Sequence, residues 1–315
     1  MHVDIRPQTQ TRPPAVSLPP QLIAGLTLIA IAWPLAWSNL RPYSDYTFFP
    51  LWLGYILTVD GLVQRRTATS LLHRDPRRWA LLFLASMPLW WLFEGLNLSV
   101  NNWNYDLPRD PSRWEYVALA SLSFSTVVPA VFETAELYRS FPAFNRPRRW
   151  VRIAPSRYGL LAIVASGVVM TIMTFLFPRQ AYPLVWLGVF FILDPLNQIL
   201  GTNSISGQVS HRRWDTVWVL WAAGLTCGFF WEMWNIFSMP KWTYDIPYIT
   251  GPKLFEMPLP GYGGYLPFAL EIYVFYQTFH LLLFRTPDRY LRFDRAGTDA
   301  ESKVPPGVVD VERAR

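Results

Sequence analysis

Charged side chains are scarce in this chain of 315 residues: Asp, Glu, Lys and Arg together make up only 16%. Apolar residues reach 51% and gather in long runs such as QLIAGLTLIAIAWPLAW and YGLLAIVASGVVMTIMTFLF. Soluble chains carry more charge and shorter apolar runs, whereas about twenty mostly apolar residues span a bilayer as a helix. The composition therefore argues against a soluble protein and predicts an all-α polytopic membrane protein.

Cysteine and histidine are also rare. The one cysteine, Cys227, lies inside an apolar run, so an intramolecular disulfide is excluded. The four histidines are scattered without metal-ligand spacing, which predicts no metal site. The glycines lack the strand–turn–helix context of a nucleotide or phosphate site, and we expect no cofactor. The polar, Pro-rich start does not follow the basic-then-apolar pattern of a signal peptide.

Eight apolar segments are candidates for transmembrane helices. They fall at about 21–38, 48–63, 79–98, 125–142, 158–177, 182–200, 214–237 and 264–284. We expect the chain to divide into an N-terminal cytoplasmic tail (1–20), a first four-helix repeat (21–142), a basic cytoplasmic linker (143–157), a second four-helix repeat (158–284) and a solvated, poorly ordered C-terminal cytoplasmic tail (285–315).

The distribution of Lys and Arg predicts the orientation. One side of the membrane holds both termini and the loops after the second, fourth and sixth segments. Only six of the 28 basic residues are left for the other side: Arg41, Arg109, Arg113, Arg179, Lys241 and Lys253. The positive-inside rule then puts both termini in the cytoplasm, and we expect an integral protein of the cell (inner) membrane. The net charge of +6 indicates anionic lipid as a neighbour and does not require nucleic acid.

The two halves of the chain repeat each other in register. Polar and aromatic residues recur about 134 to 139 positions apart: Asp60 and Asp194, Glu94 and Glu232, Asn97 and Asn235, Glu133 and Glu271, and the hexapeptides WNYDLP (Trp103–Pro108) and WTYDIP (Trp242–Pro247). Such matches indicate an internal duplication. Because each half has four segments, the copies share one orientation and form a parallel repeat about an axis along the membrane normal.

The repeated acids are the candidate chemical groups. An ionisable side chain in a membrane helix usually faces a partner, a cavity or a site. We expect Glu94 and Glu133 to approach each other at a similar depth, near the outer side, and Glu232 and Glu271 to do the same. Asp60 and Asp194 lie deeper, and they are interpreted as structural groups or as a proton relay. The structural alternative for all of them is an interhelical hydrogen bond of about 1 kcal/mol.

The hexapeptides lie on the outer side, just after the third and seventh segments. Their aromatic residues could be belt residues of the membrane interface, and Asp106 and Asp245 could cap a turn before the prolines. The fixed order Trp-x-Tyr-Asp-x-Pro equally suits the rim of a site. The predicted substrate-binding residues are Trp91, Asn97, Trp103, Tyr105, Asp106, Trp231, Asn235, Trp242, Tyr244 and Asp245.

Each half resembles the lycopene cyclase domain of the small membrane carotenoid cyclases that act as a heterodimer or a tandem fusion. The resemblance covers about 85–95 residues per half. It includes ILTVDGLVQRR and FFILDPLNQIL, PRRWALLFL and HRRWDTVWVL, LFEGLN and FWEMWN, and VVPAVFETAEL and YLPFALEIYVF. The last family motif, Pro-x-Glu-Glu, is altered: single acids follow Pro129 and Pro267 by four residues.

The resemblance implies carbocation chemistry on a carotenoid-like or other polyisoprenoid lipid. An acid protonates a double bond, the cation cyclises, and a base removes a proton. Glu94, Glu133, Glu232 and Glu271 are then the acid and base candidates, and the aromatic residues near the hexapeptides would face the cation. The duplication allows one site between the halves or two equivalent sites. The alternative function is a lipid-binding protein or a proton-coupled transporter with a pseudo-twofold cavity.

Overall fold

The computed structural model describes residues 18–144, 146 and 148–293, and in this range the protein is an all-α membrane protein. A helix lies over each of the eight predicted segments. These helices are α1 (Pro20–Ser38), α2 (Phe48–Thr67), α4 (Pro76–Val100), α6 (Val127–Arg139), α7 (Arg157–Leu176), α9 (Val185–Ile199), α11 (Asp215–Asn235) and α12 (Tyr265–Phe284). Shorter helices are α3 (Leu71–Arg74), α5 (Arg113–Phe124), α8 (Pro178–Ala181) and α10 (Ile205–Ser210).

Three 3₁₀ turns and four short strands complete the connections. The turns are η1 (Tyr43–Tyr46), η2 (Tyr182–Leu184) and η3 (Leu259–Gly264), and the strands are β1 (Trp103–Asp106), β2 (Lys241–Tyr244), β3 (Lys253–Leu254) and β4 (Met257–Pro258). The strands form two antiparallel pairs, β1 with β2 and β3 with β4.

Six helical stretches among the described residues are long and apolar enough to cross a membrane. They are Pro20–Ser38, Pro76–Val100, Arg113–Arg139, Arg157–Leu176, Pro178–Ile199 and Leu259–Phe284. Helices α2 and α11 are of similar length, 20 and 21 residues, but fall outside this group. Each carries ionisable residues along its length, including Asp60 in α2 and Glu232 in α11, which lower its mean hydropathy.

The fourth predicted segment, 125–142, was placed wrongly at its start. The membrane-length stretch begins at Arg113 and consists of α5 followed by α6. The helix changes at Ser125 and Thr126, whose hydroxyls donate to the carbonyls of Leu122 and Ser123. Such back-bonding by Ser and Thr competes with the regular helical ladder. Glu133 therefore lies far along this stretch, a point that matters for the site.

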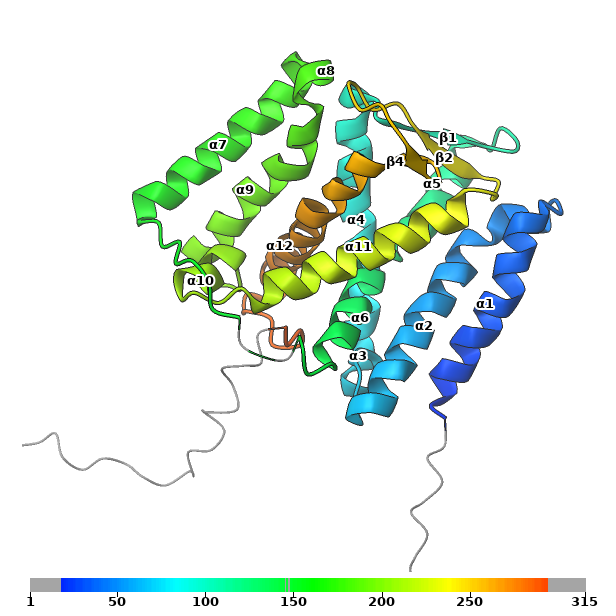
Figure 1. The fold of residues 1–315 in the computed structure, drawn as a ribbon, viewed down its shortest axis with the longest axis horizontal. Helices are drawn as coiled ribbons and strands as arrows, with labels where there is room; N and C mark the ends of the chain where they lie inside the picture. Colours follow the sequence, from blue (N-terminus) through cyan, green and yellow to red (C-terminus); the bar gives the residue numbers. More distant parts are fainter. Residues whose placement is uncertain (1–17, 145, 147, 294–315) are drawn as a thin grey trace, which may run out of the picture.

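The helices form a bundle with a hairpin at each end and four helices in the middle (Figure 1). Helices α1 and α2 pack together at one end, α7 and α9 at the other, and α4, α6, α11 and α12 lie between them. In both hairpins, glycines lie where the two helices approach each other closely. A Cβ on Gly25 would come within 2.6 Å of the Gly54 carbonyl oxygen, and one on Gly167 within 2.8 Å of the Gly188 carbonyl oxygen. Small residues allow this close backbone approach between membrane helices.

Asp60 and Asp194 hold equivalent turns in the two halves. The Asp60 carboxylate accepts hydrogen bonds from the Leu72 backbone N–H and the Ser70 hydroxyl, both 2.9 Å, at the start of α3. Asp194 accepts from the backbone N–H groups of Ile205 and Ser206, at 2.5 and 2.9 Å, at the start of α10. Both acids are buried. Their partners support the structural interpretation, in which each caps a short helix.

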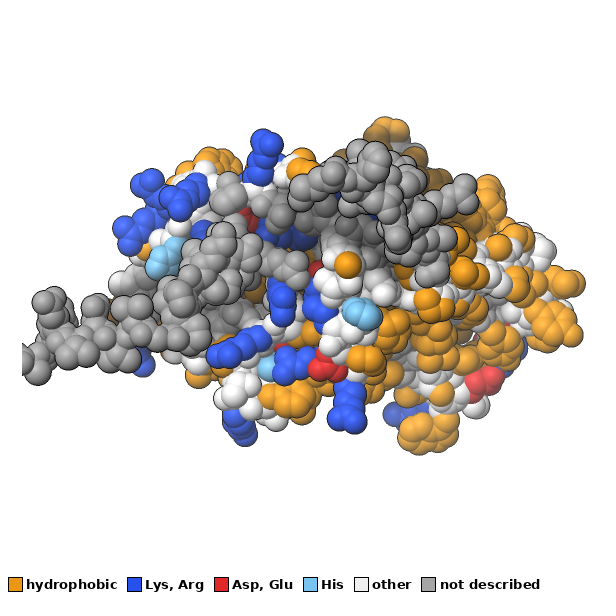
Figure 2. All heavy atoms as spheres, turned by 90° about the horizontal axis from the view of Figure 1, so that it is seen from below, with side chains coloured by type: hydrophobic (Ala, Val, Ile, Leu, Met, Phe, Trp, Pro, Cys, Tyr) orange, Lys and Arg blue, Asp and Glu red, His pale blue; other side chains and the backbone are white. Residues whose placement is uncertain are grey.

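The basic loops gather on the face of the bundle opposite the β1–β2 ribbon. Lys and Arg side chains are prominent on this face in Figure 2, and exposed examples are Arg65, Arg66, Arg77, Arg152 and Arg157. The linker between the halves lies here too. It pairs with the loop before α11: Trp150 N–H donates to the Arg212 carbonyl at 3.1 Å, and Trp214 N–H donates to the Arg148 carbonyl at 2.9 Å.

The chain after α12 corrects the prediction of a solvated tail from residue 285. Residues 286–293, which we call the C-terminal strap, pack against the basic end of the bundle. Tyr290, Leu291 and Phe293 are buried, and the Tyr290 hydroxyl donates to the Leu71 carbonyl at 2.7 Å. Asp288, also buried, contacts Arg78 at 3.5 Å and His280 at 3.6 Å. The remaining residues of the predicted tail, 294–315, lie outside the described residues, as do residues 1–17 of the N-terminal one.

Candidate functional site

The two hexapeptides meet as an antiparallel ribbon. Strand β1 pairs with β2 so that Trp103 faces Tyr244 and Tyr105 faces Trp242. Along the chain, Trp103 corresponds to Trp242 and Tyr105 to Tyr244. The two pairs therefore exchange when one half replaces the other, which is the arrangement produced by a twofold axis through the central pair of Asn104 and Thr243.

Asn97 and Asn235 anchor the ribbon to the ends of α4 and α11. The Asn97 amide donates to the Trp103 carbonyl at 2.8 Å, and its oxygen accepts from the Asn102 backbone N–H at 2.8 Å. Asn235 donates to the Trp242 carbonyl at 2.7 Å and accepts from the Trp242 N–H at 2.9 Å. Each asparagine, predicted as a substrate-binding residue, bonds the backbone and fixes the start of a strand.

Replacing Asn97 by alanine is expected to lower the free energy of unfolding by about 1–3 kcal/mol, because buried backbone groups of Asn102 and Trp103 lose their partners. Asn104 provides the matched control, since it is exposed on the same strand. Asn104→Ala should change stability by less than about 0.5 kcal/mol. Thermal unfolding of the detergent-solubilised protein measures both, and equal losses in the two variants would contradict the anchoring role.

Glu94 and Glu232 lie beneath the ribbon, each bonded to aromatic side chains. In the first half, Glu94 Oε1 accepts hydrogen bonds from the Trp90 and Trp103 indole N–H groups at 2.9 and 3.0 Å and from the Tyr105 hydroxyl at 2.7 Å. In the second half, Glu232 Oε1 accepts from the hydroxyls of Tyr244 at 2.6 Å and Tyr265 at 2.7 Å. Each glutamate thus serves as the centre of an aromatic hydrogen-bonded cluster.

The tyrosines of the ribbon remain neutral phenols. Burial, followed by the neighbouring Glu94 carboxylate, raises the pKa of Tyr105 well above its ordinary value. Burial and the Glu232 carboxylate do the same to the pKa of Tyr244. Both effects disfavour the phenolate. A neutral phenol both donates and accepts hydrogen bonds, so these residues can pass a proton between a glutamate and a neighbouring group.

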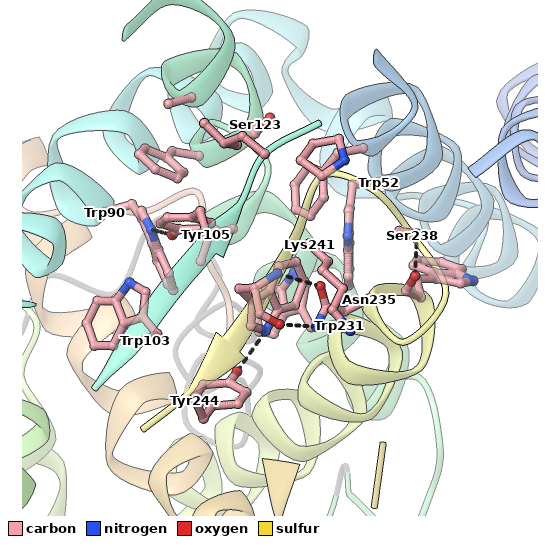
Figure 3. Close-up of a pocket in the computed structure, with 18 of the residues that line it drawn as sticks. Trp52, Trp90, Trp103, Tyr105, Ser123, Trp231, Asn235, Ser238, Lys241 and Tyr244 are labelled. Atoms are coloured by element: carbon pink, nitrogen blue, oxygen red, sulfur yellow. Dashed lines mark hydrogen bonds between the residues drawn. The ribbon is translucent and has the colours of Figure 1, made fainter. Parts of the chain in front are cut away.

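A cavity of about 650 Å³ opens beside the ribbon, within the roughly 300–1,000 Å³ of typical ligand pockets. Figure 3 shows the labelled aromatic residues gathered around the two strands. The indoles in its wall include those of Trp52, Trp90, Trp103, Trp186, Trp231 and Trp242. Tyr105, Tyr244 and Tyr265 also line it, whereas Glu94 and Glu232 do not. The glutamates therefore reach the cavity through the aromatic side chains that bind them.

Charged residues in the cavity wall already have partners. Arg109 is bonded to Glu115 and lies 4.0 Å from Asp45, and Lys241 pairs with Glu256 at 2.5 Å. The rest of the wall is mostly apolar or aromatic. No group of three His, Cys, Asp or Glu side chains that could hold a metal ion occurs in the part of the chain that the structure describes.

Six of the predicted substrate-binding residues line the cavity. They are Trp103, Tyr105, Trp231, Asn235, Trp242 and Tyr244. Trp91 points elsewhere, donating to the Ser121 hydroxyl at 2.9 Å, and Asn97 lies behind the strand that it anchors. Asp106 and Asp245 are exposed outside the wall. These two aspartates therefore do not form the expected rim of the cavity.

Glu133 corrects the expectation that Glu94 and Glu133 approach each other at a similar depth. Glu133 accepts a hydrogen bond from the Trp79 indole at 2.8 Å. Trp79 lies near the start of α4, and Glu94 lies fifteen residues and about 22 Å further along the helix. Glu133 is therefore separated from Glu94. Glu271 is fully buried in α12, and neither of its oxygens has a hydrogen-bond partner among the described residues.

Two cavity residues that contact the glutamates were not predicted. Trp90 and Tyr265 differ between the halves: the counterpart of Trp90 is Gly228, and the counterpart of Tyr265 is Val127. Because they differ, these two residues are not among the positions that match between the halves.

Comparison of the chain with protein-family models, with curated proteins and with solved structures gives no match in any of the three.

Proposed function

We propose that this protein is an integral membrane enzyme that acts on a polyisoprenoid or carotenoid-like lipid by acid-initiated carbocation chemistry: cyclisation, hydration or isomerisation. The observation that supports it most is the aromatic cavity whose wall tyrosines are hydrogen-bonded to glutamates behind them. The apolar wall suits a hydrocarbon chain, and the resemblance of each half to the lycopene cyclase domain points to the same substrate class.

The proposed mechanism uses both parts of the site. A tyrosine hydroxyl gives its proton to a double bond of the substrate and is reprotonated by its glutamate, which is general acid catalysis. The resulting carbocation is stabilised by the indole and phenol faces, each contributing about 0.5–2 kcal/mol. Loss of a proton to the other cluster ends a cyclisation or isomerisation, and addition of water ends a hydration. No redox cofactor is needed, because electrons are neither gained nor lost overall.

The proposed architecture is two parallel four-helix repeats that enclose one cavity between them. Several paired features support it: the two glycine-closed hairpins, the two aspartate-capped short helices, the two asparagine anchors and the exchange symmetry of the ribbon. In this layout α2 and α11 also cross the membrane, for a total of eight spans. Their buried acids have partners inside the bundle, which lowers the cost of placing them there.

The proposed location is the cell (inner) membrane, with both termini in the cytoplasm. The basic face lies opposite the ribbon, so the positive-inside rule would put the ribbon and the cavity on the outer side. The substrate would then enter from the outer half of the bilayer, and membrane lipid is the expected surrounding partner.

Mass spectrometry of lipid extracted from the purified protein is the first test. We expect an enriched polyisoprenoid, and a product of the same mass or heavier by one water after incubation. Turnover in D₂O should leave deuterium on the carbon that received the proton. Expression in a lycopene-accumulating bacterium tests the carotenoid case, since an unchanged pigment would remove it. If the enriched lipid is always recovered without deuterium, the result would contradict the proposed enzymatic activity.

A lipid-binding protein or proton-coupled transporter is the second candidate. It is favoured by the finding that neither Glu94 nor Glu232 lines the cavity directly. In this case the tyrosines would recognise a cargo, and the buried glutamates would relay protons. Uptake of the identified lipid into proteoliposomes, dependent on a proton gradient and without chemical change, would support the transporter. Binding without uptake or change would support the simpler role.

A further inference from the structure

The two glutamate clusters occupy equivalent positions but differ in the chemistry of their hydrogen-bond donors. The first cluster consists of Glu94, Trp90, Trp103 and Tyr105. The second consists of Glu232, Tyr244 and Tyr265. The glutamates stand 138 residues apart, and Tyr105 corresponds to Tyr244. The first cluster gains an indole from Trp90, and the second gains a phenol from Tyr265.

The extra ring in each cluster comes from a different helix. Trp90 belongs to α4, whose counterpart α11 has Gly228 at the same position. A Cβ on Gly228 would lie 2.4 Å from Cδ2 and 2.5 Å from Cε2 of the Tyr265 ring. Tyr265, from α12, therefore occupies the space that a side chain at position 228 would need. The exchange keeps an aromatic donor beside each glutamate but changes its chemical type.

An indole and a phenol differ in the hydrogen bonds that they can make with a carboxyl group. The indole N–H only donates, whereas the phenol O–H donates or accepts. Glu94 Oε1 receives two indole N–H groups and one hydroxyl. Three converging donors stabilise an ionised carboxylate. Glu232 Oε1 receives two hydroxyls, from Tyr244 and Tyr265, and either of them can reverse to accept a proton from the acid.

Burial separates the two glutamates further. Glu232 is fully buried, and its Oε2 atom has no hydrogen-bond partner among the described residues. None of the ion pairs found in the described part of the chain involves either glutamate. An ionised carboxylate at the fully buried Glu232 would be an uncompensated charge, which is strongly unfavourable. Glu94, by contrast, is only partly buried.

We propose that the resting protein holds a proton on Glu232 and an ionised carboxylate at Glu94, so that the cavity has an acid side and a base side. The catalytic use of this asymmetry rests on the proposed function, but the asymmetry itself can be measured without turnover. In the reaction, Tyr244 or Tyr265 would protonate the substrate and recover a proton from Glu232. The π pair of the double bond forms the new C–H bond.

The base side completes the proton balance. The carbocation would lose a proton toward Tyr105 and Glu94, and the C–H bonding pair forms the new double bond. One proton has then moved from Glu232 to Glu94, and exchange with water must return it before the next turnover. The asymmetry therefore predicts a fixed direction of proton movement across the cavity.

Infrared spectroscopy of the substrate-free protein tests the assignment. A carboxylic acid has a C=O stretching band that shifts in D₂O and that a carboxylate lacks. We expect Glu232→Gln to lose one such band and Glu94→Gln to keep it. The exposed Asp110 supplies a control, because Asp110→Asn removes an exposed carboxylate and should leave the carboxylic-acid band unchanged. Loss of the band in Glu94→Gln alone, or no change in either glutamine variant, overturns the proposal.

A second pair of variants keeps the test decisive if Glu232→Gln does not fold. Tyr265→Phe removes one hydrogen bond to the protonated acid and should shift its band to higher frequency. Trp90→Phe should leave the band in place, and a shift in this variant alone would overturn the assignment. The two proposals fail separately. Bands as expected without isoprenoid turnover would leave the asymmetry intact, whereas turnover with reversed bands would remove only the asymmetry.

Discussion

Replacing Glu232 by glutamine is expected to lower substrate turnover by at least about a hundredfold, because general acid catalysis contributes 10²–10⁴-fold. Glutamine keeps the size of the side chain and still accepts the hydroxyls of Tyr244 and Tyr265, but it cannot supply a proton. Tyr265→Phe should cost less, about tenfold, since Tyr244 still connects Glu232 to the cavity. Product formation by the protein in nanodiscs, compared at equal amounts of folded protein, measures both effects.

Glu271→Gln separates this prediction from the simpler idea that any buried glutamate of the repeat is catalytic. Glu271 is as buried as Glu232, but it lacks a hydrogen bond to a tyrosine of the cavity wall. Its substitution should change turnover by no more than a few fold. An equal loss in Glu232→Gln and Glu271→Gln would argue that the acids act through the stability of the bundle. Asp110→Asn, in the exposed loop between β1 and α5, sets the level of an inert change.

The sequence was sufficient to predict where the long helices lie, and it drew attention to the two hexapeptides, but it did not predict that they pair as a ribbon. Long apolar runs specify membrane helices directly, and all eight predicted segments are helical. The repeated Asn-x₅-Trp and Asn-x₆-Trp spacings bring a strand back over the end of its own helix, where the asparagine amide meets the strand backbone. The aromatic residues of the repeated hexapeptides line the cavity wall because they lie on these two strands.

The depth of Glu133 was predicted wrongly because it depends on where a helix begins. The predicted segment starts at residue 125, although the apolar run VALASLSF (Val117–Phe124) directly precedes it. The chain enters the bundle at Arg113, after a polar stretch, and α5 uses the length that was assigned to a loop. Glu133 therefore lies near the far end of the stretch, beside Trp79, instead of near Glu94.

Trp90 and Tyr265 escaped prediction for a different physical reason. The two halves of the chain pack against each other, so a side chain from one half can fill a space that the other half leaves. Gly228 has no side chain, and the Tyr265 ring occupies the space where one would lie. Neither residue stands out in one sequence, because each is meaningful only next to a partner on another helix. Packing, which the pattern of one half does not encode, decides such positions.

The second large effect is expected at the C-terminal strap, where Phe293→Ala should lower the free energy of unfolding by about 3–5 kcal/mol. Phe293 is 2% exposed, and its ring contacts Phe132 at 5.5 Å and Tyr273 at 6.2 Å between centroids. Its removal would leave a cavity between α6 and α12. Phe284→Ala, half-exposed at the end of α12, should cost less than about 1 kcal/mol. Denaturant titration followed by tryptophan fluorescence compares the two.

The strap joins the two halves, so its loss should also change how they unfold. In the strap, the Tyr290 hydroxyl donates to α3, and Arg74 of α3 donates to the Tyr290 carbonyl. Asp288 of the strap contacts Arg78 of α4, and Asn203 of the second half donates to the Asp288 carbonyl at 2.8 Å. We therefore expect Phe293→Ala to broaden the unfolding transition, because the halves lose part of their coupling. A large stability loss with an equally sharp transition would assign Phe293 to packing alone.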